Sequence, residues 1–139
     1  MHIGFYEEDA KIVASFKKKQ FRALVQHIVS KESSKTIDYI NFIACTDSYL
    51  LAINKEYLKH DYFTDIITFD YSETEIASDI YVSIDRISEN ATSNSVSLLN
   101  ELQRVLIHGV LHLVGYQDDT ESNKQVMTQK ENYYLHLLA

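Results

Sequence analysis

The 139-residue chain has no proline, no tryptophan, only three glycines and a single cysteine. One cysteine forms neither an intrachain disulfide nor a cysteine-rich zinc site, which excludes disulfide-stapled secreted folds and zinc ribbons. Without proline or a glycine-rich tract, no segment is typical of a linker. We therefore expect residues 1–139 to form one domain, a length that suits a single hydrophobic core.

Long apolar runs and an excess of positive charge are also missing. No stretch of about 18 apolar residues occurs, and no apolar segment follows a basic N-terminus, so we expect neither a membrane span nor a secretion signal. The sequence favours a cytoplasmic protein with no membrane partner. Thirteen Lys and Arg against 20 Asp and Glu give a net charge of -7, so any contact with nucleic acid has to be local.

The sequence does contain a pair of histidines at helical spacing. His108 and His112 are four residues apart, so on a helix both imidazoles share one face and reach one ion. Gly115 predicts the end of that helix, after which Asp118 presents a third ligand, with Asp119 as the alternative. Three protein ligands leave one coordination position open, which is typical of a catalytic zinc site.

The same segment also fits a purely structural role. A histidine on an apolar helix is more often a core residue with a satisfied hydrogen bond, and an aspartate in a turn often caps the next helix. Nitrogen and oxygen ligands also accept nickel, iron or manganese, so one zinc ion per chain is the first of several expectations.

Hydrophobic periodicity predicts an α+β fold with a mixed four-stranded sheet and helices on both faces. Residues 63–71 and 76–84 are too close in sequence for a parallel crossover, so we expect these two strands to pair antiparallel. The predicted strands span residues 2–6, 36–46, 63–71 and 76–84, and the predicted helices span residues 11–30, 47–58, 85–93 and 98–114, with a last helix from 119 or 120. We expect Asp47, Asp85 and Ser97 to cap the middle three helices.

The run from residue 108 to 119, HGVLHLVGYQDD, resembles the signature of the YbeY family, whose usual form is H-G-x-L-H-L-x-G-Y-D-H. This family comprises bacterial metal-dependent endoribonucleases of ribosomal RNA maturation and ribosome quality control. Residues 64–69, TDIITF, resemble the family's T-D/N-V-L-S-F strand, and residues 54–57, NKEY, resemble its N-x-x-F/Y element. Asp79-Ile80, Met127 and Glu131 fit further family positions, so the resemblance covers most of the chain.

The resemblance implies a zincin-like fold and a single YbeY-like metal-dependent hydrolase domain. It implies that His108, His112 and Asp118 hold one divalent ion, with zinc the first expectation. It further implies single-stranded RNA as the substrate, the 3′ end of the 16S rRNA precursor as the target, and the ribosome or small-subunit proteins as partners.

Three positions depart from the family pattern. Asp118 stands where the family has a third histidine, and its negative charge should make bound zinc a weaker Lewis acid. Gln117 replaces the preceding aspartate. Leu58 replaces an arginine, which removes a fixed cation, and the neighbouring Lys59 is an inferior substitute because it lacks a planar fork.

Candidate catalytic residues are Asp65 and Lys59, with Thr64 and Asp79 in second rank. The best basic patch for RNA binding comprises Lys17, Lys18, Lys19 and Arg22, although such a run is more often a solvated helix face. Four tyrosines are candidates for stacking on bases, although tyrosines more often pack at the rim of a core: Tyr57, Tyr62, Tyr71 and Tyr81.

Two different functional classes compete with the nuclease. A metalloendopeptidase of the zincin type needs a glutamate directly after the first histidine, and Gly109 occupies that position. A non-catalytic, ribosome-associated binding module would use the metal only to lock the helix and its turn. For a nuclease, the sequence does not distinguish attack by water from attack by the ribose 2′-hydroxyl.

Overall fold

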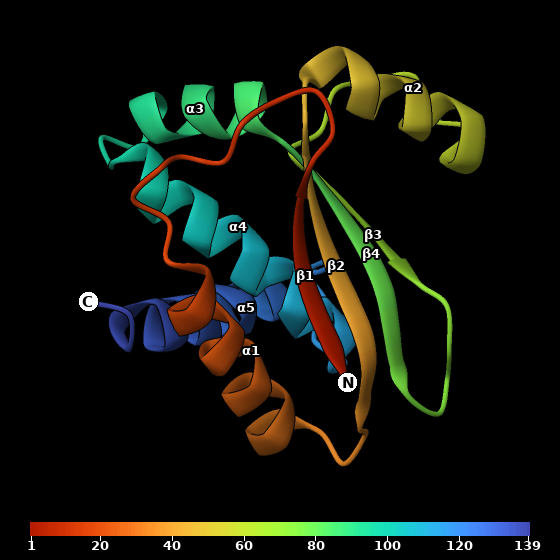
Figure 1. Cartoon of the computed structure of the whole chain (residues 1–139), viewed down its shortest axis with the longest axis vertical. Helices are drawn as coiled ribbons and strands as arrows, with labels where there is room; N and C mark the ends of the chain where they lie inside the picture. Colours follow the sequence, from red (N-terminus) through yellow and green to blue (C-terminus); the bar gives the residue numbers. More distant parts are fainter.

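The centre of the structure is a four-stranded sheet in the order β1-β2-β4-β3 (Figure 1). The computed structural model describes residues 1–139. β1 (His2–Glu7), β2 (Ile37–Cys45) and β4 (Ile76–Ser83) run parallel, and β3 (Ile66–Asp70) pairs antiparallel with β4 at one edge. The predicted α+β fold, the mixed sheet and the antiparallel pairing are all confirmed.

Five helices follow or separate the strands. A hydroxyl at the N-cap accepts a backbone N–H in four of them, at Thr46, Ser83, Ser97 and Thr120. The cap expected at Ser97 is confirmed, whereas the caps expected at Asp47 and Asp85 lie one and two residues earlier. No helix combines the length and apolarity that a membrane crossing requires. The helices are α1 (Lys18–Glu32), α2 (Asp47–Leu58), α3 (Ile84–Ser93), α4 (Leu98–Leu113) and α5 (Glu121–His136).

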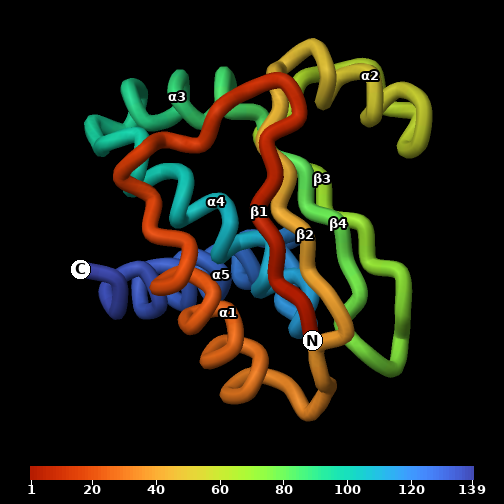
Figure 2. The backbone as a smooth tube through the Cα atoms, viewed as in Figure 1, coloured from red at the N-terminus to blue at the C-terminus, as the bar shows by residue number.

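The helix expected over residues 11–30 is wrong in its first part, because residues 8–17 form an irregular connection from β1 to α1 (Figure 2). The amide of Phe16 bonds the carbonyl of Val13 at 3.0 Å in a turn. Phe16 is buried, and Ile12 and Val13 pack against the core. The spacing of these apolar side chains in the sequence matches the period of a helix, although the segment is not helical. Similarly, the strand expected to begin at residue 63 begins at Ile66.

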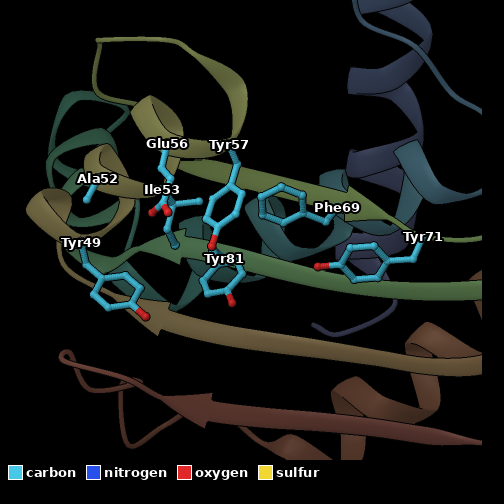
Figure 3. A pocket seen from close by; sticks show the side chains of 8 residues that line it. All are labelled: Tyr49, Ala52, Ile53, Glu56, Tyr57, Phe69, Tyr71 and Tyr81. Atoms are coloured by element: carbon cyan, nitrogen blue, oxygen red, sulfur yellow. The ribbon is translucent and has the colours of Figure 1, made fainter.

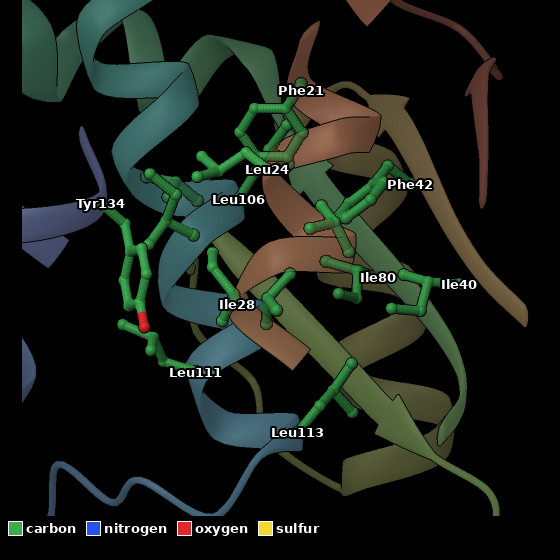
Figure 4. Packing of buried hydrophobic residues seen from close by; sticks show 14 of the residues in the cluster. Phe21, Leu24, Ile28, Ile40, Phe42, Ile80, Leu106, Leu111, Leu113 and Tyr134 are labelled. Carbon is green, nitrogen blue, oxygen red and sulfur yellow. The ribbon is translucent and has the colours of Figure 1, made fainter. Parts of the chain in front are cut away.

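The main core lies between the sheet and helices α1, α4 and α5 (Figure 4). Fully buried side chains meet there from every layer: Ile40 and Ile80 from the sheet, Ile28 from α1, Leu111 from α4 and Tyr134 from α5. Full burial of one large apolar side chain contributes about 1.5–3 kcal/mol. This packing fixes α4 against the sheet and so positions the helix that carries both histidines.

The opposite face of the sheet is covered at one end only. Leu50 of α2 packs there against Ile67, with Tyr81 at the border of the cluster. Helices therefore lie on both faces of the sheet, as expected, but in unequal number. The other four helices contribute to the main core, whereas α2 alone packs on this face.

Glu32, at the C-terminal end of α1, joins three distant parts of the chain. Its side chain is 9% exposed and accepts hydrogen bonds from Lys130 Nζ at 3.1 Å, from the Tyr116 hydroxyl at 2.7 Å and from the Tyr134 hydroxyl. Burial acts to raise the pKa of Glu32, but the three hydrogen bonds and the charge of Lys130 lower it below its usual 4.5 on balance.

We expect Glu32→Gln to lower the free energy of unfolding by about 1–3 kcal/mol near neutral pH. Because the folded-state pKa is depressed, the carboxylate stabilises the fold above about pH 4.5, and this contribution is lost as pH falls through the folded-state pKa. The free energies of unfolding of wild type and variant, measured by urea denaturation, should therefore become more similar as the pH is lowered. If the free energies of unfolding of wild type and Glu32→Gln differ by the same amount at every pH, the role of the Glu32 carboxylate is contradicted. Glu121→Gln, which changes an exposed glutamate, is the control.

Candidate metal centre

Two imidazoles and one carboxylate converge at the C-terminal end of α4. His108 and His112 lie one helical turn apart, and their Nε2 atoms are 2.9 Å from each other. Gly115 turns the chain at a φ of 107°, after which Asp118 Oδ2 lies 3.2 Å from His108 Nε2 and 3.4 Å from His112 Nε2. One ligand atom from each residue lies within 4.8 Å of the others. The structure thus brings the three predicted ligands together.

Asp119, the alternative third ligand, faces elsewhere. Its carboxylate accepts a hydrogen bond of 2.8 Å from Asn123 Nδ2 at the start of α5. That hydrogen bond lowers the pKa of Asp119. Of the two aspartates, only Asp118 belongs to the cluster around the histidines.

The other nitrogen of each imidazole has a defined acceptor. His112 Nδ1 lies 2.9 Å from the Tyr116 carbonyl oxygen, which can only accept, so Nδ1 of His112 carries the proton. His108 Nδ1 lies 2.6 Å from Glu131 Oε2 and donates to that carboxylate. Both Nε2 lone pairs and the Asp118 carboxylate therefore face one point. A divalent metal ion at that point would satisfy all three acceptors.

Glu131 on α5 orients the imidazole of His108. Its other oxygen, Oε1, forms an ion pair of 3.0 Å with Arg104, and its side chain is 10% exposed. Burial acts to lower the pKa of His108, but the hydrogen bond to Glu131 and the charges of Glu131, Asp118 and Asp65 raise it on balance. In the sequence, Glu131 is notable only as a position that fits the family pattern. Its partner His108 is 23 residues away in the sequence, so no local sequence pattern predicts the contact.

We expect Glu131→Gln to weaken metal binding by about tenfold to a hundredfold, because an outer hydrogen bond fixes the ring of a ligating histidine and raises its basicity. Metal titration against a chromophoric chelator measures this affinity. Asn132→Ala is the matched control, because Asn132 contacts the same Arg104 at 2.7 Å and no contact with His108 is lost. Equal losses in both variants would contradict the orienting role.

Gly109 allows α4 to lie close against the sheet. A Cβ atom at this position would lie 2.9 Å from Ile66 Cδ1 and 3.3 Å from both Ile80 Cδ1 and Thr68 Oγ1. The glycine therefore faces β3 and β4, whereas the neighbouring His108 faces the cluster. The glutamate that a zincin peptidase carries at this position would have to displace the end of the Ile66 side chain.

Two hollows flank the ligand cluster. A cleft of about 400 Å³ runs along one side, and Leu58, His60, Tyr62 and Asp65 contribute to its walls. A second hollow, of about 280 Å³, contains Arg104. Asp65, a predicted catalytic residue, borders both hollows beside His108, and burial raises its pKa despite the opposing charge of His108. A carboxyl group with a raised pKa at a cleft is suited to proton transfer.

The structure places other predicted residues at varying distances from this cleft. Thr64 lines it, whereas Lys59 ends α2 with its Nζ held 3.2 Å from the Glu56 carbonyl oxygen. Asp79 lies on the opposite face of the sheet, where it accepts hydrogen bonds from Asn41 and Tyr71.

The predicted basic patch is not brought to the cluster. Lys17 borders the N-terminal end of α4 near Leu99, and nine residues of helix, about 13 Å, separate Leu99 from His108. Arg22 is occupied within the fold, because its Nε donates to the Ile3 carbonyl at 3.0 Å and its guanidinium covers the ring of Phe5.

The fold and the centre together are those of a small α+β protein in which a helix and the turn after it bring together two imidazoles and a carboxylate suited to hold a metal ion. Comparison with known proteins is more specific. The chain belongs to the Endoribonuclease YbeY family, whose sequence model matches residues 3–139. The resemblance seen in the histidine signature is thereby confirmed.

Individual relatives agree with this assignment. The Endoribonuclease YbeY of Cytophaga hutchinsonii is 42% identical over 137 residues, covering 97% of this chain and 94% of its own. That of Flavobacterium johnsoniae is 48% identical over 106 residues, with 76% and 75% covered. The solution structure of a Thermotoga maritima protein is similar with a TM-score of 0.68 at 28% identity, covering 96% of this chain and 86% of its own.

Proposed function

We propose that this chain is a metal-dependent, single-strand-specific endoribonuclease that acts in the cytoplasm in 16S rRNA 3′-end maturation and ribosome quality control. The observation that carries the proposal is the convergence of His108, His112 and Asp118 beside a cleft of about 400 Å³, in a chain of the Endoribonuclease YbeY family. Residues 1–139 would form a single YbeY-like hydrolase domain, with the ribosome or small-subunit proteins as partners.

The residues of the centre have separate roles in this proposal. His108, His112 and Asp118 would hold one divalent ion, with zinc the first expectation, and Glu131 would orient His108. When bound, the ion supplies Lewis acidity toward a phosphodiester. Asp65 would hold or accept a proton at the cleft, which its raised pKa favours.

Substitution of Leu58 tests the electrostatics of the cleft. Leu58 lines the wall beside the ligand cluster, and no lysine or arginine lines the same cleft. We expect Leu58→Arg to increase RNA cleavage by about tenfold, because a fixed guanidinium stabilises charge that develops on a phosphate. Leu58→Lys should give a smaller increase, because an ammonium lacks the planar fork. Unchanged rates for both folded variants would contradict this role.

The test of the function is cleavage of a labelled precursor of the 16S 3′ end, with a duplex of the same sequence as a control. Cleavage by the metal-loaded chain that stops on chelation and resumes when zinc is restored is the expected result. Absence of cleavage by a folded, metal-loaded chain would overturn the proposal. Mass spectrometry of the products identifies the nucleophile, because a 2′,3′-cyclic phosphate end arises only from attack by the 2′-hydroxyl.

A further inference from the structure

A second pocket lies on the face of the sheet opposite the metal centre, between α2 and the β3–β4 hairpin (Figure 3). It has a volume of about 470 Å³ and is here named the aromatic pocket. α2 contributes Tyr49, Glu56 and Tyr57, and the hairpin contributes Phe69, Tyr71 and Tyr81. Three of the tyrosines considered for base stacking thus gather at one place, away from the metal centre.

The rings of the aromatic pocket present both faces and edges. Phe69 is the central ring, perpendicular to Tyr81 and nearly so to Tyr57, and parallel to Tyr71, at centroid distances of 6.0–6.1 Å. Tyr57 is 63% exposed and Tyr71 is 55% exposed. A contiguous aromatic surface left open to solvent in this way is typical of a binding site.

Glu56 is the one charged residue that lines the aromatic pocket. No lysine or arginine lines it, and the carboxylate of Glu56 has neither a hydrogen bond nor an ion pair within the chain. The nearby Asp79 accepts the Tyr71 hydroxyl at 3.0 Å. Burial is the main cause that raises the pKa values of Tyr49 and Tyr81. The charge of Glu8 raises the pKa of Tyr49 further, and the charge of Asp79 raises that of Tyr81. Such a pocket favours a cation and disfavours a phosphate.

We propose that the aromatic pocket binds an arginine side chain presented by a basic segment of a partner protein. A guanidinium stacks on aromatic faces through its planar surface and donates two parallel hydrogen bonds to a carboxylate, here that of Glu56. A lysine ammonium matches the charge of the pocket but not its planar rings. An RNA base matches the rings, but its phosphates meet the negative charge of Glu56 and Asp79.

Helix α2 separates the aromatic pocket from the metal cleft. Glu56 and Tyr57 line the aromatic pocket, whereas Asn54 and Leu58 line the cleft beside the candidate ligands. The two sites therefore open on different sides of one helix. An arginine side chain held at the aromatic pocket therefore does not fill the metal cleft.

Fluorescence anisotropy tests the proposal with a labelled peptide that alternates arginine and glycine. We expect Glu56→Gln and Tyr57→Ala to weaken its binding by about twofold to thirtyfold relative to wild type. Tyr57 is exposed and Glu56 is unpaired, so both variants should keep the melting temperature of wild type. The matched controls are Glu121→Gln and Tyr133→Ala, which remove an exposed carboxylate and an exposed tyrosine on α5 and should bind like wild type.

A second peptide, with citrulline in place of arginine, isolates the charge because the two side chains have nearly the same shape. Weak binding of the citrulline peptide supports the proposal. Equal binding of both peptides, or equal binding of the arginine peptide by wild type and the two pocket variants, would overturn it. Binding of a labelled oligouridine that is lost in Tyr57→Ala, while arginine-peptide binding is unchanged, would also overturn it and assign the aromatic pocket to RNA.

Discussion

Replacing His112 with alanine is expected to abolish metal binding at the candidate centre and to reduce RNA cleavage by about a thousandfold or more. The variant leaves only His108 and Asp118 of the three converging ligands. A bound metal ion contributes several kcal/mol to stabilisation of a transition state, and each 1.36 kcal/mol corresponds to about a tenfold change in rate. Metal content after dialysis and single-turnover cleavage of the 16S precursor measure the two effects.

Matched variants separate the ligand role from a general loss of structure. His136→Ala removes an exposed imidazole at the end of α5 and should leave both measurements unchanged. Asp118→Ala should lose metal and activity, whereas Asp119→Ala should keep both, because only Asp118 faces the histidines. If His112→Ala lowers the melting temperature but leaves ribosome association and the cell phenotype nearly intact, the metal is structural and the chain acts as a binding module.

Gly109→Glu is expected to destabilise the fold strongly, although it creates the H-E-x-x-H pattern of zincin peptidases. The new side chain would start 2.9 Å from Ile66 Cδ1 and would carry a carboxylate between α4 and the sheet. Overpacking together with an unpaired buried charge costs about 3 kcal/mol or more, which corresponds to a fall in melting temperature of about 10 °C. Thermal unfolding followed by circular dichroism measures it.

Gly109→Ala is the control for this substitution. The added methyl group meets the flexible end of Ile66, and the cost of this contact is offset by the gain of about 1 kcal/mol from replacing glycine within a helix. We expect a change within about 1 kcal/mol. A stable Gly109→Glu protein that cleaves a peptide library would revive the peptidase alternative and show that α4 can move away from the sheet.

The part of the centre that could be predicted is the part encoded within one short segment. The spacing of His108 and His112 and the glycine turn before Asp118 depend on helix geometry alone, so the sequence indicates them directly. The contact of Glu131 with His108 depends on how α5 packs against α4, a tertiary arrangement that no local pattern encodes. The same holds for Glu32, whose partners Tyr116 and Tyr134 are 84 and 102 residues away.

The fold shows the same division between local and distant causes. The alternation of residues 76–84 was sufficient to predict β4, and the short connection before it was sufficient to predict the antiparallel pair. The helix predicted over residues 11–30 is wrong for residues 11–17. Apolar side chains at helical spacing also occur in an irregular segment that packs along the surface of the core. Phe16 is buried because the irregular segment packs against the core. The sequence around Phe16 does not distinguish this arrangement from burial on a helix.

The order in which the centre is completed follows from the position of α5. His108 belongs to α4, yet the carboxylate that orients it belongs to α5, and α5 also supplies Tyr134 to the network of Glu32. During synthesis, a chain that has not yet released α5 from the ribosomal tunnel has both histidines but an unsupported metal site. Under the proposed function, the metal site therefore reaches its full affinity only once α5 has left the tunnel and packed against α4.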